Sequence, residues 1–302
     1  MRRLQLFWWA PRRSVRLARP ERQNLPAWSR LALRTGRPFL NFGDELSRVV
    51  VAEAAGLPVD WAAPERAELV AVGSVLEIAA GASGRVTVWG TGLRGDPTPD
   101  RREVLLSHIE RVLAVRGPRT RDALGLPPDT PLGDPGLLAY RHVARAVRPR
   151  EVLVIPHFTQ WNTRAGRQQV AAAAGAGLRV VEPSVAPLAM LRRIAAAQFV
   201  YSASLHGVIV AHALGVPAQL LRAEEVRPPE PLWKYEDYFG SMALPVEWST
   251  WGEVLARPRN SALVDLRGDQ APDIRDRAHA LGEGLTAALH GWVGRRDPAL
   301  RV

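Results

Sequence analysis

The 302-residue chain has no cysteine, so it can form neither disulfide bonds nor thiolate metal sites. The absence of cysteine fits a reducing compartment. Lysine is nearly absent too: Lys234 is the single lysine, and 40 basic side chains minus one leaves 39 arginines. The arginines are scattered rather than grouped in blocks, so the formal net charge of +10 does not by itself indicate nucleic-acid binding.

Long apolar runs are also missing, since none approaches the roughly 20 residues that a membrane span requires. The N-terminal segment 4–9 is apolar, but it is short, contains Gln5 and lacks a small-residue cleavage site, so it does not predict a signal peptide. We therefore expect a soluble, cytoplasmic protein. Its basic surface would suit an anionic membrane face or a phosphorylated substrate.

Several catalytic and cofactor motifs are absent. Gly90-Thr91-Gly92 lacks the third glycine of a dinucleotide fingerprint, and neither a P-loop nor a Gly-x-Ser-x-Gly elbow occurs. The seven histidines include no pair at metal-ligand spacing. The sequence therefore predicts neither a cofactor nor a catalytic metal.

Short apolar runs alternate with helical patterns along most of the chain, which predicts an α/β protein with parallel sheets. Strands are expected at 4–9, 69–72, 86–89, 112–115, 152–155, 178–181, 198–201 and 216–221, the last being the final clear strand. A helix is expected with Asn41 or Asp44 as its cap and Gly56 and Pro58 at its end. Further helices are expected at 101–111, 118–124, 164–174 and 188–196, from 205 to a stop at Gly215, and near 274–292. The segment 12–38 is basic and rich in loop-forming residues, so we expect it to be irregular.

A polar, proline-containing stretch ends near residue 148 and separates two runs of this alternation. We therefore predict two Rossmann-like domains that face a cleft. The first comprises residues 1–147, and the second, 148–302, carries a C-terminal helix.

The most informative stretch is 202–217, where an apolar strand leads directly into a helix. Ser202 or Ser204 can cap this helix, and His206 lies in its first turn. A strand that leads into a helix leaves free backbone N–H groups and a positive dipole end at the junction, which together form an anion site. His206 is a candidate acid/base, whereas His212, deeper in the apolar helix, is interpreted as structural.

Further polar loops follow the other predicted strands, where ligands of open α/β sheets bind. Each of these loops is common in α/β proteins, and only their combination is informative. Their candidate residues are Gly43, Asp44, Ser74, Thr91, Arg116, Arg119, Asp134 and His157. Arg116 and Arg119 flank a Gly-Pro helix start, where guanidinium groups can add to backbone N–H groups in holding a phosphate or carboxylate. The segment 233–239, which includes Glu236, fits either a sugar-binding loop or an ordinary amphipathic helix.

Six of these segments occur in the order found in polysaccharide pyruvyl transferases, and the chain resembles the bacterial exopolysaccharide branch of that family. The segments are Asn41-Phe42-Gly43-Asp44, Val115-Arg116-Gly117-Pro118-x-Thr120, Gly133-Asp134-Pro135, Ile155-Pro156-His157, Ser202-x-Ser204-Leu205-His206-Gly207 and Lys234-Tyr235-Glu236-Asp237-Tyr238. The resemblance spans about residues 38–245.

The resemblance implies two Rossmann-like domains similar to the B-type glycosyltransferase fold. It also implies transfer of the pyruvyl group of phosphoenolpyruvate to a sugar, as a cyclic ketal, with release of phosphate. Phosphoenolpyruvate is then a donor substrate rather than a cofactor, and the sugar acceptor can be a lipid-linked oligosaccharide at the cytoplasmic membrane face. Relatives can carry Arg-Leu-His where this chain has Ser204-Leu205-His206, so donor binding here would use Arg116, Arg119 or another arginine.

On this basis the expected catalytic residues are His206, Asp44 and Asp134. The expected substrate-binding residues are Gly43, Ser74, Thr91, Arg116, Arg119, His157, Ser202, Ser204 and Glu236. Two alternatives stay open: a nucleotide-sugar glycosyltransferase of the same architecture, and a basic module that binds nucleic acid or anionic lipid without turnover. The sequence does not determine the acceptor sugar or the oligomeric state.

Overall fold

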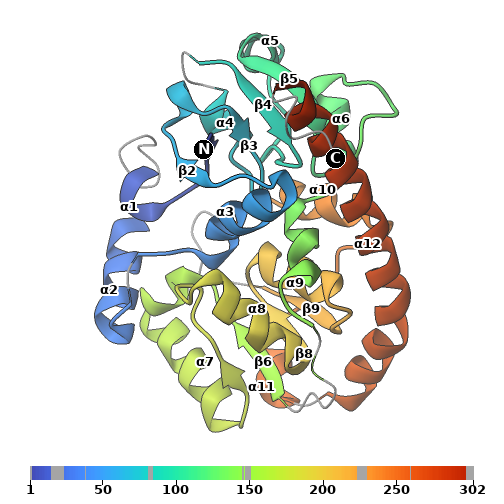
Figure 1. The fold of residues 1–302 in the computed structure, drawn as a ribbon. Coiled ribbons are helices and arrows are strands. Elements are labelled where there is room, and N and C mark those ends of the chain that lie inside the picture. The colour runs from blue at the N-terminus through green and yellow to red at the C-terminus, as the bar shows by residue number, and fades with distance from the viewer. Residues whose placement is uncertain are drawn as a thin grey trace.

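The computed structural model describes residues 2–14, 24–37, 39–80, 84–144, 146, 151–222, 230–258 and 260–296. Within these ranges the strands form two five-stranded parallel sheets, one from each half of the chain (Figure 1). The strand orders are β2-β1-β3-β4-β5 and β10-β9-β8-β6-β7. Numbered along the chain within each sheet, both orders are 2-1-3-4-5, a doubly wound arrangement. The fold is therefore α/β with two Rossmann-like sheets, as the alternating pattern predicts.

The first sheet contains short strands joined mostly by helices. Its strands are β1 (Leu4–Phe7), β2 (Val59–Trp61), β3 (Leu69–Val70), β4 (Val86–Trp89) and β5 (Ile109–Ala114). The helices of this half are α1 (Pro11–Ser14), α2 (Leu25–Thr35), α3 (Phe42–Ala55), α4 (Leu76–Ala79), α5 (Pro99–Ser107) and α6 (Pro118–Leu124), with 3-10 turns η2 (Pro64–Arg66) and η3 (Pro135–Arg141).

The second sheet repeats the arrangement. Its strands are β6 (Glu151–Ile155), β7 (Arg179–Val180), β8 (Ala197–Ser202), β9 (Ala218–Leu221) and β10 (Trp248–Ser249). Its helices are α7 (Arg164–Gly175), α8 (Pro187–Ala195), α9 (Leu205–Ala213), α10 (Trp233–Ser241), α11 (Trp251–Ala256) and α12 (Ser261–Arg296), with the 3-10 turn η4 (Phe158–Trp161). No helix among the described residues is both long enough and apolar enough to cross a membrane.

One predicted helix is too long, and two strands were missed. The helix expected at 101–111 ends at Ser107, because Ile109 begins β5 and pairs with Val86 of β4. The strands β2 and β10 were not predicted, and β10 follows the segment expected to be the final strand. Both are short, three and two residues long, and each exists by pairing with one neighbour, β1 and β9 respectively. Such pairing is not readable from a local pattern.

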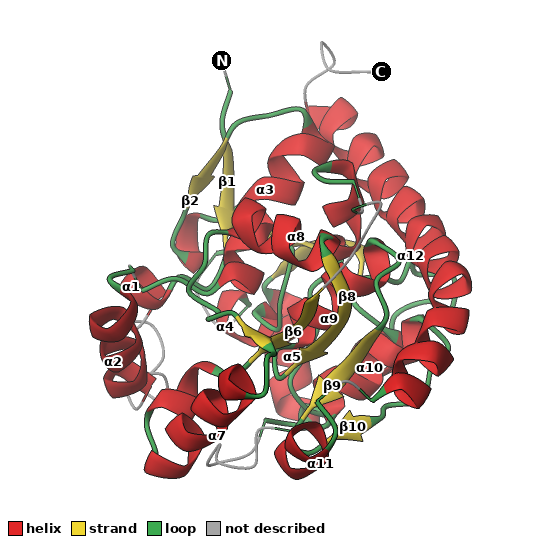
Figure 2. Cartoon of the chain, turned by 90° about the horizontal axis from the view of Figure 1, so that it is seen from below, coloured by secondary structure: helices red, strands yellow, loops and turns green. Residues whose placement is uncertain are grey.

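The segment 12–38 is not irregular throughout, because it contains α1 and α2. Helix α2 buries Ala27, Trp28 and Leu31, and the Trp28 ring stacks on Phe158 of η4 with centroids 4.4 Å apart. A helix from the first half of the sequence thus packs on the second half, where its apolar face is covered. Figures 1 and 2 both show α2 beside the region of α7.

Helix α12 belongs to the second half of the sequence and packs on the first half. It runs for 36 residues through Pro272 and reaches the first sheet, where the indole N–H of Trp89 donates to the Leu285 carbonyl at 2.8 Å. At its end Arg296 pairs with Glu68 and Glu110. Figure 1 shows this helix along one side of both halves. The boundary predicted near residue 148 lies outside the described residues and stays a prediction.

Candidate active site

The predicted loops gather at the switch points of the two sheets. In a 2-1-3-4-5 order the connections diverge between the first and third strands, and open α/β sheets bind their ligands beyond the carboxyl ends of these two strands. In the first sheet these strands are β1, whose connection leads to the start of α3, and β3, which leads into Gly73-Ser74. In the second sheet they are β6, which leads to His157, and β8, which leads to the start of α9.

The starts of α3 and α9 meet at His206. Asn41 caps α3: its side-chain oxygen accepts from the Gly43 backbone N–H, and its amide donates to the Asp44 carboxylate at 2.6 Å. The His206 ring lies against Gly43 so closely that a methyl group at Gly43 would overlap it. A methyl group at Gly73 would lie 2.9 Å from Asp44 Oδ1 and 3.9 Å from His206 Cε1. The two glycines therefore allow Asp44 and His206 to approach each other across the two halves.

His206 is poised as a neutral ring. Its Nε2 is shielded from solvent and has no hydrogen-bond partner among the described residues. Burial, together with the charges of Lys234 and Arg116, lowers the pKa of His206 to about 3. The imidazole is therefore uncharged at neutral pH and can accept a proton, and its pKa would rise when negative charge arrives beside it.

Asp134 lies at the start of η3, fully buried. Its Oδ1 accepts from the Gly136 backbone N–H at 2.8 Å. Burial raises the pKa of Asp134 to about 7, although the amides of Gly136 and Gly73 and the charge of Arg116 oppose the shift. Gly73 is thus near all three expected catalytic residues, Asp44, Asp134 and His206. A carboxyl group that titrates near neutral pH can either donate or accept a proton.

Arg116 was expected to bind an anion, but its guanidinium is buried and bonded to other protein groups. Its Nε donates to Asp237 at 3.0 Å, Nη2 donates to the Leu93 carbonyl at 2.7 Å, and Nη1 donates to the Ser74 hydroxyl. Asp237 also accepts from the backbone N–H and the hydroxyl of Thr120. The predicted residues Arg116 and Ser74 are therefore bonded to each other, and both guanidinium and carboxylate are sealed from solvent.

Arg119 and Glu236 form a pair closer to solvent, with Arg119 Nη2 3.0 Å from Glu236 Oε2. The Arg119 guanidinium also lies over the Trp233 ring, 5.2 Å from its centroid. Both partners of Arg119 are on α10. The segment 233–239 therefore lies in a helix and not in a loop.

The remaining predicted residues shape the backbone. The Ser202 hydroxyl donates to the Ser204 carbonyl and accepts from the Ser204 N–H, which fixes the turn before α9. Ser204 is the N-cap of α9, but its side chain makes no capping hydrogen bond. Thr91 is buried and donates to the Gly73 carbonyl at 2.7 Å, so it holds the turn on which Asp44 and His206 converge. His212 is buried and bonded to the Tyr238 hydroxyl at 2.9 Å, as its structural interpretation predicts.

Sequence reasoning missed a charged cluster beside these residues. Glu230 lies 3.2 Å from Arg94, is bonded to Lys234, and lies 3.9 Å from His157. Burial lowers the pKa of His157 to about 4, so this ring is neutral as well. The available signal was the identity of Lys234, the single lysine in a chain whose other basic side chains are all arginine. Asp237 was missed as a site residue too, because only the fold places it on Arg116.

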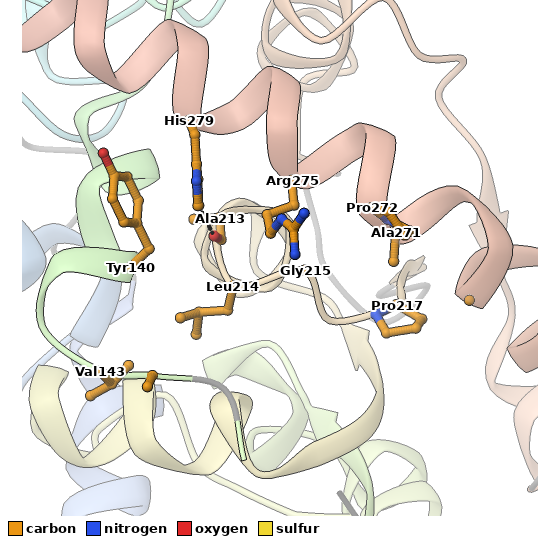
Figure 3. A pocket seen from close by; sticks show the side chains of 12 residues that line it. Tyr140, Val143, Ala213, Leu214, Gly215, Pro217, Ala271, Pro272, Arg275 and His279 are labelled. Atoms are coloured by element: carbon orange, nitrogen blue, oxygen red, sulfur yellow. Dashed lines mark hydrogen bonds between the residues drawn. The ribbon is translucent and has the colours of Figure 1, made fainter. Parts of the chain in front are cut away.

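A cavity of about 510 Å³ lies elsewhere, where α12 passes the loop between α9 and β9 (Figure 3). His279 stacks on Tyr140 with ring centroids 3.9 Å apart, and its Nε2 lies 2.9 Å from the Ala213 carbonyl. These contacts join α12 to η3 and to the last residue of α9, at the other end of that helix from His206. In the part of the chain that the structure describes, no three His, Asp or Glu side chains are grouped as metal ligands.

Comparison with known proteins completes the description of the site. Residues 52–219 match the family model described as polysaccharide pyruvyl transferase. The matched range includes Gly73, Arg116, Asp134, His157 and His206, whereas the start of α3 and all of α10 lie outside it. No curated protein matches the chain. Because the match covers more than half of its length, the chain belongs to the polysaccharide pyruvyl transferase family and is a transferase.

Proposed function

We propose that this protein transfers the pyruvyl group of phosphoenolpyruvate to two hydroxyls of a sugar in a cell-surface glycan precursor, such as an exopolysaccharide precursor. The product is a cyclic ketal, and phosphate is released. The observation that carries the proposal is the convergence of His206, Asp44 and Asp134 on Gly73, at the switch points of two sheets. We also propose that the two halves are arranged as in a B-type glycosyltransferase, with the reaction in a cleft between them.

The donor carries a carboxylate and a phosphate, which require cationic or N–H partners. The start of α9 offers backbone N–H groups and a positive dipole end, and the Ser204 hydroxyl is uncommitted to capping there. Arg116 contributes to donor binding indirectly, since it holds Ser74 and the Leu93 backbone in place. Arg119 and Glu236, a partly exposed pair at the starts of α6 and α10, are the residues proposed to contact the acceptor.

The reaction needs a proton on the methylene carbon of the donor and a proton acceptor for each sugar hydroxyl. Neutral His206 takes up a proton as the donor dianion raises its pKa, and then delivers that proton to the methylene carbon. The first hydroxyl oxygen attacks the resulting cationic carbon and gives its proton to Asp44 or Asp134. The second hydroxyl oxygen then attacks the same carbon as the C–O bond to phosphate breaks, and its proton leaves with the phosphate.

The test is phosphate release from phosphoenolpyruvate with hexoside acceptors that have free hydroxyl pairs, with mass spectrometry to detect the ketal. Wild-type protein should give both products. His206→Ala should remove turnover while the circular dichroism spectrum and melting temperature stay close to those of the wild type. Wild-type turnover by His206→Ala would remove this ring from the mechanism.

The competing activity gives a different product. Release of nucleoside diphosphate from nucleotide sugars, with no phosphate from phosphoenolpyruvate, would contradict the proposal and favour a glycosyltransferase. We further propose a cytoplasmic location, a lipid-linked acceptor and contact with an anionic membrane, all of which follow from the family chemistry and the basic surface. A flotation assay with phosphatidylglycerol vesicles at low and high salt tests the membrane contact.

A further inference from the structure

The Glu230 carboxylate interacts with two cationic side chains, Arg94 and Lys234. Glu230 is bonded to Lys234, one helical turn ahead on the approach to α10, and lies 3.2 Å from Arg94 Nη2. The neutral ring of His157 faces the same carboxylate, with its Nε2 at 3.9 Å. The charges of Lys234 and Arg94 outweigh the effect of burial and lower the pKa of Glu230 to about 2, so the carboxylate is ionised.

The described ion pairs nearby each join one cation to one anion, whereas here two cations meet one carboxylate. Among the described residues Arg116 pairs with Asp237, and Arg119 pairs with Glu236. Arg94 and Lys234 instead share Glu230 as their ion-pair partner within the described part of the chain. Lys234 is only 14% exposed, so its ammonium depends on an anion beside it, and Glu230 supplies that anion in this structure.

The cluster lies next to the reacting groups. The Leu93 carbonyl, adjacent to Arg94, is held by Arg116. On α10, Lys234 is three residues before Asp237, the other partner of Arg116, and therefore lies on the same helix face. His157 follows β6 at the switch point of the second sheet, beside the strand that leads to His206. Lys234 and Arg116 are both close enough to His206 for their charges to lower its pKa, and Arg94 is linked to Lys234 through Glu230.

We propose that Arg94 and Lys234 form an anion-binding subsite, which the Glu230 carboxylate occupies when no substrate is bound. An acid group of the substrate then displaces the Glu230 carboxylate from these two cations. This rests on the proposed function, in which the donor supplies a carboxylate and a phosphate. Either group satisfies the same two cations. Lys234 then provides the cation that the resemblance expects from an arginine where Ser204 stands. A lysine suits an exchange of partners, because its compact charge sits on a flexible stem.

If the substrate displaces Glu230, substitution of Glu230 and substitution of Lys234 should change the dissociation constants of anionic ligands in opposite directions. Glu230→Gln removes the internal competitor and keeps the shape, so the dissociation constants of inorganic phosphate and phosphoenolpyruvate should fall about tenfold. Lys234→Met removes a cation of the subsite, so both constants should rise at least about tenfold. If Glu230 is a structural or proton-transfer group instead, Glu230→Gln will leave these constants unchanged or raise them.

Isothermal titration calorimetry at fixed ionic strength measures both ligands against wild type, Glu230→Gln, Lys234→Met and Lys234→Arg. Glu110→Gln is the matched control, because it removes a carboxylate from an arginine pair on the first sheet, with Arg296, and should change nothing. Lys234→Arg keeps the charge and should bind phosphate better than Lys234→Met. If Lys234→Met does not fold, the tighter binding expected of Glu230→Gln still tests the subsite.

The outcomes separate this inference from the proposed function. If Glu230→Gln binds phosphate more tightly but no variant turns over phosphoenolpyruvate, the subsite stands and the proposed function fails. If wild type transfers pyruvyl groups but Glu230→Gln leaves both constants unchanged, the function stands and the subsite is overturned. Absence of phosphate and phosphoenolpyruvate binding by both wild type and Glu230→Gln would overturn the subsite as well.

Discussion

Among the side chains of α10, neutralising the buried Asp237 carboxylate should lower the free energy of unfolding most. It faces Arg116 and accepts hydrogen bonds from the backbone N–H and hydroxyl of Thr120, and both charged side chains are at most 1% exposed. Asp237→Asn keeps the shape but leaves the Arg116 guanidinium without a counter-charge. Breaking such a pair from one side costs about 3–5 kcal/mol of unfolding free energy.

This cost converts into a melting temperature. An unfolding entropy of about 2.1 cal/mol/K per residue over 302 residues gives about 0.6 kcal/mol/K, so Asp237→Asn should melt about 5–8 °C lower than wild type. Glu236→Gln is the matched control, since the preceding residue of the same helix pairs with Arg119 of the same partner helix α6. That pair is partly exposed, so its loss should cost at most about 1 kcal/mol, or under about 2 °C.

Differential scanning calorimetry of the two variants decides the matter. Equal shifts for Asp237→Asn and Glu236→Gln would refute the reasoning that burial sets the cost. A second check is Arg116→Met in the Asp237→Asn background. Removing the orphaned charge should recover part of the lost stability, and a further fall would show that the guanidinium contacts with Ser74 and Leu93, rather than its charge, dominate.

Two more predictions follow from the site. Gly43→Ala should reduce phosphate release from phosphoenolpyruvate at least about tenfold, because the new methyl group overlaps the His206 side chain and displaces its ring. Gly284→Ala, with nothing within 4 Å of the added methyl, is its control, and wild-type rates in Gly43→Ala would contradict the close approach. Asp134→Asn should gain stability relative to wild type between pH 5 and pH 8. Burial raises the pKa of Asp134 to about 7, so the wild-type carboxyl group favours the folded state below the unfolded pKa near 4, and this contribution is lost as the pH rises through 7. Urea midpoints at the two pH values measure the difference, and an unchanged or reversed difference would mean that this carboxyl is ionised in the folded protein throughout.

Part of the fold was predictable because its signals are local. The helix α6 begins at Pro118 and ends before Gly125, which has a φ of 62°, as the proline and glycine positions predict. The capping box of Thr250 and Glu253 forms at the start of α11. Asn41 and Gly56 bound α3 in the same way. In each case the residues that satisfy the helix ends are neighbours in sequence.

Other features depend on partners that are distant in sequence. Helix α2 forms where a basic, irregular segment was expected, because Trp28 and Leu31 are covered by the second half of the chain. The Glu230 cluster brings Arg94 and His157 together across more than 60 residues. The neutral state of His206 likewise depends on burial and on the charges of Lys234 and Arg116.

The sequence by itself determined the α/β alternation, the strand-end loops with their candidate residues and the resemblance that the family match bears out, since all of these are encoded in short segments. Only the tertiary structure decided which loops meet, that Arg116 is sealed by Asp237, and that Gly43 and Gly73 admit the His206 ring beside Asp44. The physical reason is that burial, charge pairing and close approach are properties of the space between elements, and residues far apart in sequence create that space together.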